Sequence, residues 1–358
     1  MGDSFEITVS ENYPKNAKYP DRNDLLTVFA SYGINDICNV KLIDTTRGDA
    51  DIRLNYIADK KYVLRFCNTP DLTEDRLNGL QKLINRYLIS GIVCPRYISR
   101  SDGLYLHEWN GLMYYLSEYI DLPLADEVDI ADEDRLSSEI LESIAAFAEA
   151  NKNIDLLDTM GMYSLFDLCP FDKKEGIDEK EQNFNLLTDA LNESECTELA
   201  EKLVRRHRSI RKDLKEIYKD LPRCVFQCDE NWSNILIDAE QHFKGFIDFN
   251  LAGTEVIVNQ FANLAGFDYD ESNLTPIGAS RRFDNALRGY HSRMETIRKI
   301  YKMNDLEQKA LCLYAWIVMI SQWPAVCYFK KQLNDPIMKE EIVGLLNLIA
   351  ELPESELV

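Results

Sequence analysis

Histidine, paired cysteines and long apolar stretches are scarce in this sequence, and each scarcity argues against a class of protein. The 4 histidines show no spacing to Asp or Ser that suits a hydrolytic triad. The 9 cysteines form no Cys-x-x-Cys pair, so reduced thiols are indicated rather than a zinc site or a disulfide scaffold. The longest strongly apolar run, residues 310–320, is too short to span a bilayer.

Basic residues are also in deficit, since 40 Lys and Arg stand against 61 Asp and Glu, a net charge of −21. This balance argues against a general nucleic-acid binder and against binding to anionic membranes, because both need a basic face. It favours a cationic partner at long range, although ordinary acidity of soluble proteins explains it more simply. The N-terminus lacks the basic and apolar regions of a signal peptide, so a cytoplasmic protein is expected.

The length of 358 residues and the hydrophobic content of 46% suit a chain with two lobes, each with its own core. Residues 1–22 are polar and predict an arm or a loosely docked extension. Residues 23–120 predict a small lobe of mixed helix and strand. Residues 121–358 predict a mainly helical lobe, and nothing in the sequence indicates the oligomeric state.

The first lobe has a clear local pattern of strands around one long helix. Leucines and Ile84 recur at helical spacing over residues 73–90, and Gly91 and Pro95 end that helix. Asp24 is expected to cap a short helix over residues 25–32. Strands are predicted by β-forming residues at 40–44, 52–57, 62–66, 104–107 and 112–120.

The second lobe reads as a series of helices. A first helix carries an apolar stripe from Leu136 to Phe147, and residues 170–195 look like an exposed acidic insertion. In the helix predicted over 196–221, the cluster at 205–208 is most simply a solvated face. Trp316, Trp323 and Tyr328 are expected to pack in a core, although such rings can also bind a quaternary amine. Further helices are predicted near 256–267, 278–303, 305–332 and 336–352.

The most informative segment lies between Phe226 and Phe249. Asp229 and Asn234 stand in a polar loop ahead of an apolar strand, and Asp248 ends the next short strand. Phosphoryl transfer needs a carboxylate that orients the attacking hydroxyl and oxygen ligands for the metal ions that bridge the phosphates. Asp229 suits the first role, and the other two suit the second. A turn rich in Asp and Asn is the alternative, because these residues favour turns.

These residues resemble the catalytic core of the aminoglycoside phosphotransferase and choline kinase family, relatives of the protein kinases. The family pattern is roughly His-Gly-Asp-x-x-x-x-Asn-Ile/Val-Leu, followed by a strand ending Ile-Asp-Phe/Trp; here Gln227 stands at its His and Cys228 at its Gly. The resemblance implies an α+β, bilobal, protein-kinase-like fold with an antiparallel-sheet N-lobe. It further implies Asp229 as catalytic base and Asn234 and Asp248 as ligands of Mg²⁺.

The resemblance also implies a nucleotide site. Val63 and Arg65 alternate onto one strand face, where Val63 would cover the adenine and Arg65 would hold the phosphates of ATP or GTP. The family's helix carries a Glu that pairs with this cation, whereas the matching position here is Gln81, with Glu74 the nearest upstream carboxylate. This position is a further departure from the family pattern, and it leaves open whether the ion pair is present.

The other face of the adenine would rest on Ile247, and its edge would be read by a hinge. The segment Ser117-Glu118-Tyr119 is similar to the family hinge, where backbone groups of Ser117 and Tyr119 would bond the base. Any strand end offers such groups, so this assignment depends on position.

The implied reaction is transfer of the γ-phosphate to a hydroxyl of a small molecule that is aminoglycoside-, choline- or sugar-like and possibly cationic. Four acidic residues would suit a polyamine-like acceptor, although they are more simply helix-end and loop residues: Glu255, Asp268, Asp270 and Glu271. The departures at Gln227, Cys228 and Gln81 leave a second hypothesis, a kinase-like binding or scaffold protein with weak or no turnover.

Overall fold

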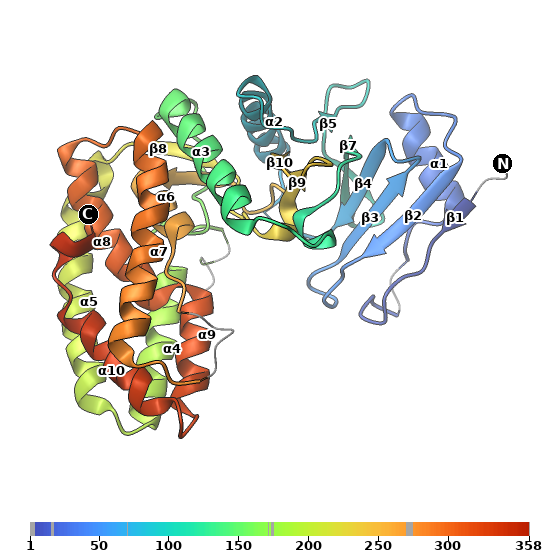
Figure 1. The fold of residues 1–358 in the computed structure, drawn as a ribbon. Helices are drawn as coiled ribbons and strands as arrows, with labels where there is room; N and C mark the ends of the chain where they lie inside the picture. The colour runs from blue at the N-terminus through green and yellow to red at the C-terminus, as the bar shows by residue number, and fades with distance from the viewer. Residues whose placement is uncertain are drawn as a thin grey trace. The chain divides into compact units, whose positions relative to one another are not determined.

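The computed structural model describes residues 4–15, 18–69, 71–170, 172, 175–269 and 275–357 and is drawn in Figure 1. The chain divides into two compact units, which are described separately below. Unit 1 comprises Met1–Ala131 and Glu230–Asp248, and unit 2 comprises Asp132–Asp229 and Phe249–Val358. This division differs from the expected boundary at residue 120, because residues 121–131 and 230–248 group with the sheet of unit 1.

Unit 1 is built on one sheet, with strand order β1-β2-β3-β4-β7-β5 and β6 paired to β7 among the described residues. Neighbouring strands are antiparallel except β1 and β2, which run parallel. The strands are β1 (Ser4–Glu6), β2 (Asn39–Asp44), β3 (Arg53–Ala58), β4 (Tyr62–Cys67), β5 (Tyr97–Ile98), β6 (His107–Trp109) and β7 (Leu112–Glu118).

The N-terminal segment corrects two expectations. The predicted loose arm over residues 1–22 is wrong for its described part, because β1 pairs with β2 and Tyr13 is buried. That pairing makes the sheet mixed rather than wholly antiparallel. Helix α1 (Arg22–Ser31) is capped by Asp21, whereas the predicted cap, Asp24, lies inside the first turn and completes a reciprocal capping box.

The two faces of this sheet have different characters, because side chains alternate along each strand. Leu54, Tyr56, Leu64 and Phe66 point to one face and pack with α1 in a continuous core. Full burial of each such side chain stabilises the fold by about 1.5–3 kcal/mol. The other face carries the half-buried or buried side chains of Asn55, Val63, Arg65, Tyr115 and Ser117.

The predicted helix over residues 73–90 is confirmed as α2 (Glu74–Ile89), with Thr73 as its N-cap and Ser90 as its C-cap. The segment after α2 attaches the hairpin of β9 (Ile235–Ile237) and β10 (Phe243–Phe246) to unit 1. The Val93 N–H donates to Lys244 O at 2.7 Å, and Val93 O accepts from Phe246 N–H at 2.9 Å. A Cβ at Gly245 would lie 1.8 Å from Val93 O, so only glycine permits this close approach.

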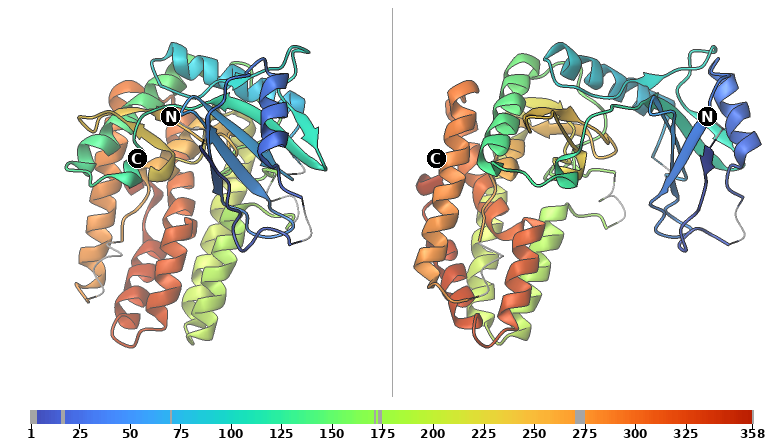
Figure 2. Two further views of the ribbon diagram at one scale, coloured as in Figure 1. Left: turned by 90° about the vertical axis from the view of Figure 1, so that its right-hand side faces the viewer. Right: turned by 45° about the vertical axis from the view of Figure 1, so that its right-hand side comes forward.

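Unit 2 combines a small ladder with a helical bundle. Figure 2 shows its long helices side by side, and α4 contacts both α5 and α9. Strands β8 (Arg223–Phe226) and β11 (Gly253–Val256) pair antiparallel. The α-helices of unit 2 are α3 (Glu133–Asn151), α4 (Glu179–Glu193), α5 (Thr197–Ile217), α6 (Ile257–Ala265), α7 (Ala279–Ile300), α8 (Asp305–Ser321), α9 (Trp323–Leu333) and α10 (Lys339–Glu351). Short 3₁₀ turns lie at Tyr218–Asp220 and Glu354–Leu357 in unit 2, and at Ala125–Glu127 and Trp232–Asn234 in unit 1.

The apolar run over 310–320 is the buried middle of α8. The single helix predicted over 305–332 is instead two, because α9 starts afresh after Gln322 with Pro324 in its first turn. Trp316 is buried as expected, but Trp323 is 53% exposed. Among the described residues no single helix is long and apolar enough to cross a membrane, although α8 and α9 together, bent by 43°, meet the same length and composition test.

The predicted exposed insertion over residues 170–195 is wrong in its second half. Helix α4 buries Phe184, Leu187 and Leu191, which recur at helical spacing among the acidic residues. The ring of His207 stacks on Phe184 with centroids 3.9 Å apart. The cluster at 205–208 is therefore a solvated face only in part.

Candidate active site

A row of polar side chains crosses three strands of the unit 1 sheet, on the face opposite the core that includes α1. Arg65 on β4 lies opposite Asn55 on β3 and opposite Tyr115 on β7. Its Nε donates to Asn55 Oδ1 at 2.7 Å, and its Nη1 donates to the Tyr115 hydroxyl at 3.1 Å. Sequence reasoning did not single out Asn55 or Tyr115, since their relation to Arg65 depends on strand register.

The same guanidinium reaches the end of the β9–β10 hairpin. Arg65 Nη2 lies 3.2 Å from Asp248 Oδ2, with side-chain exposures of 21% and 29%. The Ile247 N–H donates to Asn234 O at 2.9 Å, so a backbone bond ties the residue before Asp248 to Asn234. Within unit 1 the structure thus brings the Arg65 and Asp248 side chains together and joins the backbone of Asn234 to that of Ile247.

Charge is retained on this cation. Burial acts to lower the pKa of Arg65, but the neighbouring Tyr115 and Asp248 outweigh it and leave that pKa above its ordinary value. The guanidinium is therefore a fixed positive charge at the hairpin end, suited to a phosphate anion.

The expected hinge is already engaged in backbone pairing. Ser117 pairs with Val63 on one side and Tyr97 on the other. The Tyr119 N–H donates to Lys61 O at 2.8 Å, so this bond would have to open before the N–H could meet an adenine. Glu118 holds the start of β5, because its Oε2 accepts from Arg96 N–H at 3.0 Å.

The two residues expected to enclose the base belong to different elements of unit 1. Val63 stands two positions before Arg65, on the same face of β4, and its side chain is half-buried. Ile247 is also half-buried and immediately precedes Asp248. Both side chains retain exposed apolar surface that a planar ligand can cover.

Asp229 belongs to unit 2, and the side chain of Gln227 bonds its backbone. Gln227 is buried, and its Oε1 accepts from the Asp229 N–H at 2.7 Å. The Gln227 amide thus positions the backbone of the loop. Asp229 itself is half-buried.

Backbone conformation explains the glycine of the family pattern. Cys228 has φ of 61° and Asp248 has φ of 55°, the left-handed region that costs non-glycine residues conformational energy. Cys228 is buried, and a Cβ on Gly161 would meet its Sγ at 2.9 Å. Strained backbone at two motif residues is typical of functional sites.

Of the four acidic residues that would suit a polyamine-like acceptor, Glu255 proves to be a buried carboxyl. Glu255 on β11 is 1% exposed; its Oε1 accepts from Val256 N–H and Asn259 Nδ2, and Oε2 has no hydrogen-bond partner among the described residues. Burial raises the pKa of Glu255 to about 7. It therefore belongs to no exposed acidic surface, whereas Asp268 is exposed; Asp270 and Glu271 lie outside the described residues.

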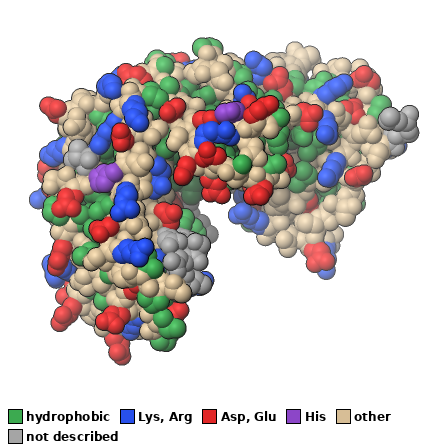
Figure 3. All heavy atoms as spheres, in the orientation of Figure 1, with side chains coloured by type: hydrophobic (Ala, Val, Ile, Leu, Met, Phe, Trp, Pro, Cys, Tyr) green, Lys and Arg blue, Asp and Glu red, His purple; other side chains and the backbone are tan. Residues whose placement is uncertain are grey.

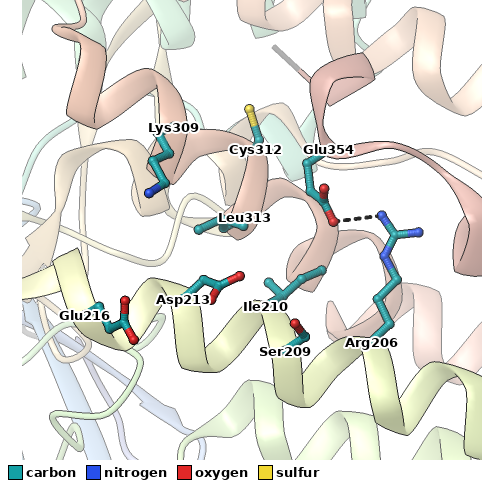
Figure 4. A pocket seen from close by; sticks show the side chains of 9 residues that line it. All are labelled: Arg206, Ser209, Ile210, Asp213, Glu216, Lys309, Cys312, Leu313 and Glu354. Atoms are coloured by element: carbon teal, nitrogen blue, oxygen red, sulfur yellow. Dashed lines mark hydrogen bonds and ion pairs between the residues drawn. The ribbon is translucent and has the colours of Figure 1, made fainter.

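A surface groove among the described residues of unit 2 lies apart from the predicted site. On the face drawn in Figure 3, acidic and basic side chains are interspersed. A surface groove of about 590 Å³ in unit 2 is lined by α5, α8 and the C-terminal turn, and no residue of the predicted site lines it (Figure 4). Its Arg206 is committed to Glu354 and to the carbonyl oxygens of Ile349, Ala350 and Leu352.

The model of the phosphotransferase enzyme family matches residues 47–297, which is more than half of the chain. The chain belongs to this family. The family resemblance predicted from the Asp-x₄-Asn and Ile-Asp-Phe segments is thereby confirmed. Both segments lie inside the matched region. No curated protein matches the chain.

Solved structures place this phosphotransferase family member in the protein-kinase-like fold, as the sequence predicted. An amicoumacin kinase in complex with AMP-PNP, Ca²⁺ and Ami is 12% identical, with TM-score 0.52, covering 89% of this chain and 92% of that one. A microcompartment-associated aminopropanol kinase is 12% identical, with TM-score 0.50, covering 92% and 95%. At this identity the likeness establishes the fold alone.

Proposed function

We propose that this protein is an ATP- and Mg²⁺-dependent kinase that transfers the γ-phosphate to a hydroxyl of a small molecule. The observation that carries the proposal is the contact of Arg65 with Asp248, with Asn234 bonded to the adjoining residue. A cation suited to phosphate thus lies against Asp248, one of the two oxygen ligands that we assign to the metal, and a backbone bond joins Asn234, the other, to the residue before it. The nucleotide-bound amicoumacin kinase, which shares the fold, supports nucleotide use.

Asn234 and Asp248 would hold Mg²⁺, which typically takes one or two protein oxygens and completes its shell with phosphates and water. When bound, the metal neutralises the charge of the transferred phosphoryl group. Arg65 would bind phosphate oxygens through its planar fork. Asp229 would accept a hydrogen bond from the acceptor hydroxyl, aim its oxygen and take its proton.

Val63 and Ile247 would enclose the adenine, and backbone groups of the hinge at Ser117, Glu118 and Tyr119 would read its edge. GTP would fit the same phosphate ligands. The acceptor class follows from charge and from the named substrates of the fold's relatives: aminopropanol is both an amine and an alcohol. A cationic, hydroxyl-bearing small molecule in the cytoplasm, rather than a nucleic acid or a membrane, agrees with the net charge of −21.

The decisive experiment measures ATP consumption with Mg²⁺ against a panel of aminoglycosides, choline, amino alcohols and sugars. We expect Asp229→Asn to lower turnover by about 10²–10⁴-fold while ATP binding is kept, because the substitution removes only the base. The matched control is Asp220→Asn, an exposed residue of the same unit, which should leave turnover unchanged.

The alternative, a binding or scaffold protein, predicts ATP binding without acceptor-dependent consumption. It draws on Cys228 and Gln227 at the family's Gly and His. Turnover that does not change in Asp229→Asn would remove the assigned base, and no turnover with any acceptor would favour the scaffold.

A further inference from the structure

The row formed by Asn55, Arg65 and Tyr115 contains two residues that the proposed reaction leaves without a role. Asn55 is on β3 and Tyr115 on β7, and both lie directly opposite Arg65 in the strand register. Each accepts a hydrogen bond from a different nitrogen of the guanidinium, at 2.7 and 3.1 Å. The two flanking strands therefore fix both the position and the rotation of this planar group.

We propose that Asn55 and Tyr115 are the positioning residues that aim Arg65 at the nucleotide phosphates. The proposal rests on the phosphotransferase function proposed above. Nε and Nη1 of Arg65 are taken up by the sheet, and Nη2 faces Asp248 at the hairpin end. The edge of the fork that carries Nη2 is thus directed to the place where phosphates and metal would lie.

The neutrality of these two partners matters for phosphate affinity. Asn55 carries no charge, and burial raises the pKa of Tyr115, which keeps its hydroxyl protonated. Neutral acceptors orient a cation without cancelling its charge, so its attraction for phosphate is retained. Among the three partners Asp248 alone is charged.

Two side chains of α2, Gln81 at the family's Glu position and Glu74 upstream of it, bond groups other than Arg65. Gln81 Oε1 accepts from Tyr97 N–H at 2.7 Å, and its Nε2 donates to Asn85. Glu74 accepts from the N–H groups of Tyr105 and Leu106. These side chains hold the segment around β5 and β6, whereas Asn55 and Tyr115 are the sheet side chains that bond Arg65.

This arrangement also explains arginine at position 65. Three partners approach from three directions, and a guanidinium presents N–H groups on three nitrogens in one plane. A lysine ammonium is a single point on a flexible stem and cannot satisfy them in the same geometry. The sheet row and the residue type are therefore matched.

The test compares binding of ATP and of adenosine by calorimetry in Asn55→Ala and Tyr115→Phe. Each change removes one hydrogen bond to the charged group, and we expect ATP affinity to fall on the order of tenfold while adenosine affinity is unchanged. Asn39→Ala and Tyr19→Phe are matched controls, since both residues are exposed in the same unit. Asn55→Leu, which removes the acceptor but keeps a similar volume, replaces Asn55→Ala if that variant does not fold.

A double-mutant cycle separates positioning from a general structural effect. In an Arg65→Ala background neither Asn55→Ala nor Tyr115→Phe should weaken ATP further, because no guanidinium remains to be aimed. A further loss in that background, or an equal loss for adenosine and ATP, overturns the proposal.

The two proposals fail in different ways. A wild-type protein that binds ATP more tightly than adenosine, with unchanged affinities in the Asn55 and Tyr115 variants, overturns the positioning roles and leaves the kinase. A wild-type protein that binds no ATP overturns both.

Discussion

Position 65 illustrates how the identity of a single residue follows from the directions of its neighbours. Asn55, Tyr115 and Asp248 approach the guanidinium from two strands and from the end of a hairpin. The structure therefore gives a physical reason for arginine at this position, since a guanidinium can bond all three side chains. The sequence alone showed only that Arg65 matches a position of the family pattern. Arg65 does not need a Glu at position 81 to orient it, because Asn55 and Tyr115 in the sheet bond its guanidinium.

At the same scale, Glu255 predicts a pH dependence of stability. Burial, its largest cause, raises the pKa of Glu255 from 4.5 to about 7, although hydrogen bonds and the charges of Arg223 and Lys180 oppose it. The folded state then binds this proton more tightly than the unfolded state. Its contribution is complete below about pH 4.5 and is lost as the pH rises towards 7, by about 3 kcal/mol.

Glu255→Gln mimics the protonated form and should therefore stabilise the protein at pH 8 while changing little at pH 5. Urea unfolding at both pH values measures this, with the exposed Glu216→Gln as control. An equal effect of Glu255→Gln at the two pH values would show that the carboxyl does not titrate in this range.

At the scale of elements, the Asp229 loop depends on a backbone conformation that the family meets with glycine. Cys228 adopts φ of 61° directly after β8, and Gln227 bonds across it to the Asp229 N–H. The hairpin ends in the same region of φ/ψ space, at Asp248. Local sequence predicts the strands and the turn, but the sign of φ at a cysteine is decided by the packing around it.

A pair of substitutions tests this conformation. Alanine at position 228 keeps the left-handed strain and glycine removes it, so Cys228→Gly should be more stable than Cys228→Ala by about 1 kcal/mol. The order should reverse at Cys224, inside strand β8, where glycine weakens a strand. Urea unfolding of the four variants gives both comparisons, and the same order at both positions would contradict the strained loop.

At the scale of the whole molecule, the chain passes between its two units three times. Two of these passages lie directly after Asp229 and directly after Asp248. The predicted base and a predicted metal ligand thus stand at the ends of one segment, 230–248, that links unit 2 to the sheet of unit 1.

Ligand-linked stability provides a prediction at this scale. Binding to the folded state raises its stability by about 2.7 kcal/mol at one hundred times the dissociation constant. We expect AMP-PNP to raise the melting temperature more with Mg²⁺ than without it. In Asp248→Asn, where Asn tolerates the same positive φ, the Mg²⁺-dependent part should vanish; its persistence would remove Asp248 as a metal ligand.

Much of unit 1 follows from local sequence. The alternation in β3 and β4 and the heptad-like stripe of α2 are set by residues near one another in the chain, so their periodicity reveals them. The same signal misjudged α4, whose buried Phe184 and Leu187 were outweighed by the many acidic residues around them. It also merged α8 with α9, since periodicity alone does not show a break.

By itself the sequence determined the kinase-like family and the residue types of the site, because Asp229, Asn234 and Asp248 stand at fixed spacings within one short segment. Only the tertiary structure decided which side chains share a partner. Asn55, Tyr115 and Asp248 surround the Arg65 guanidinium although almost two hundred positions separate the first from the last. Strand register places Asn55 and Tyr115, and the attachment of the β9–β10 hairpin through Val93 places Asp248. The tertiary structure likewise determined the burial of Glu255. The sequence shows only an acidic residue there, whereas in the fold its carboxyl is buried and its pKa is raised to about 7.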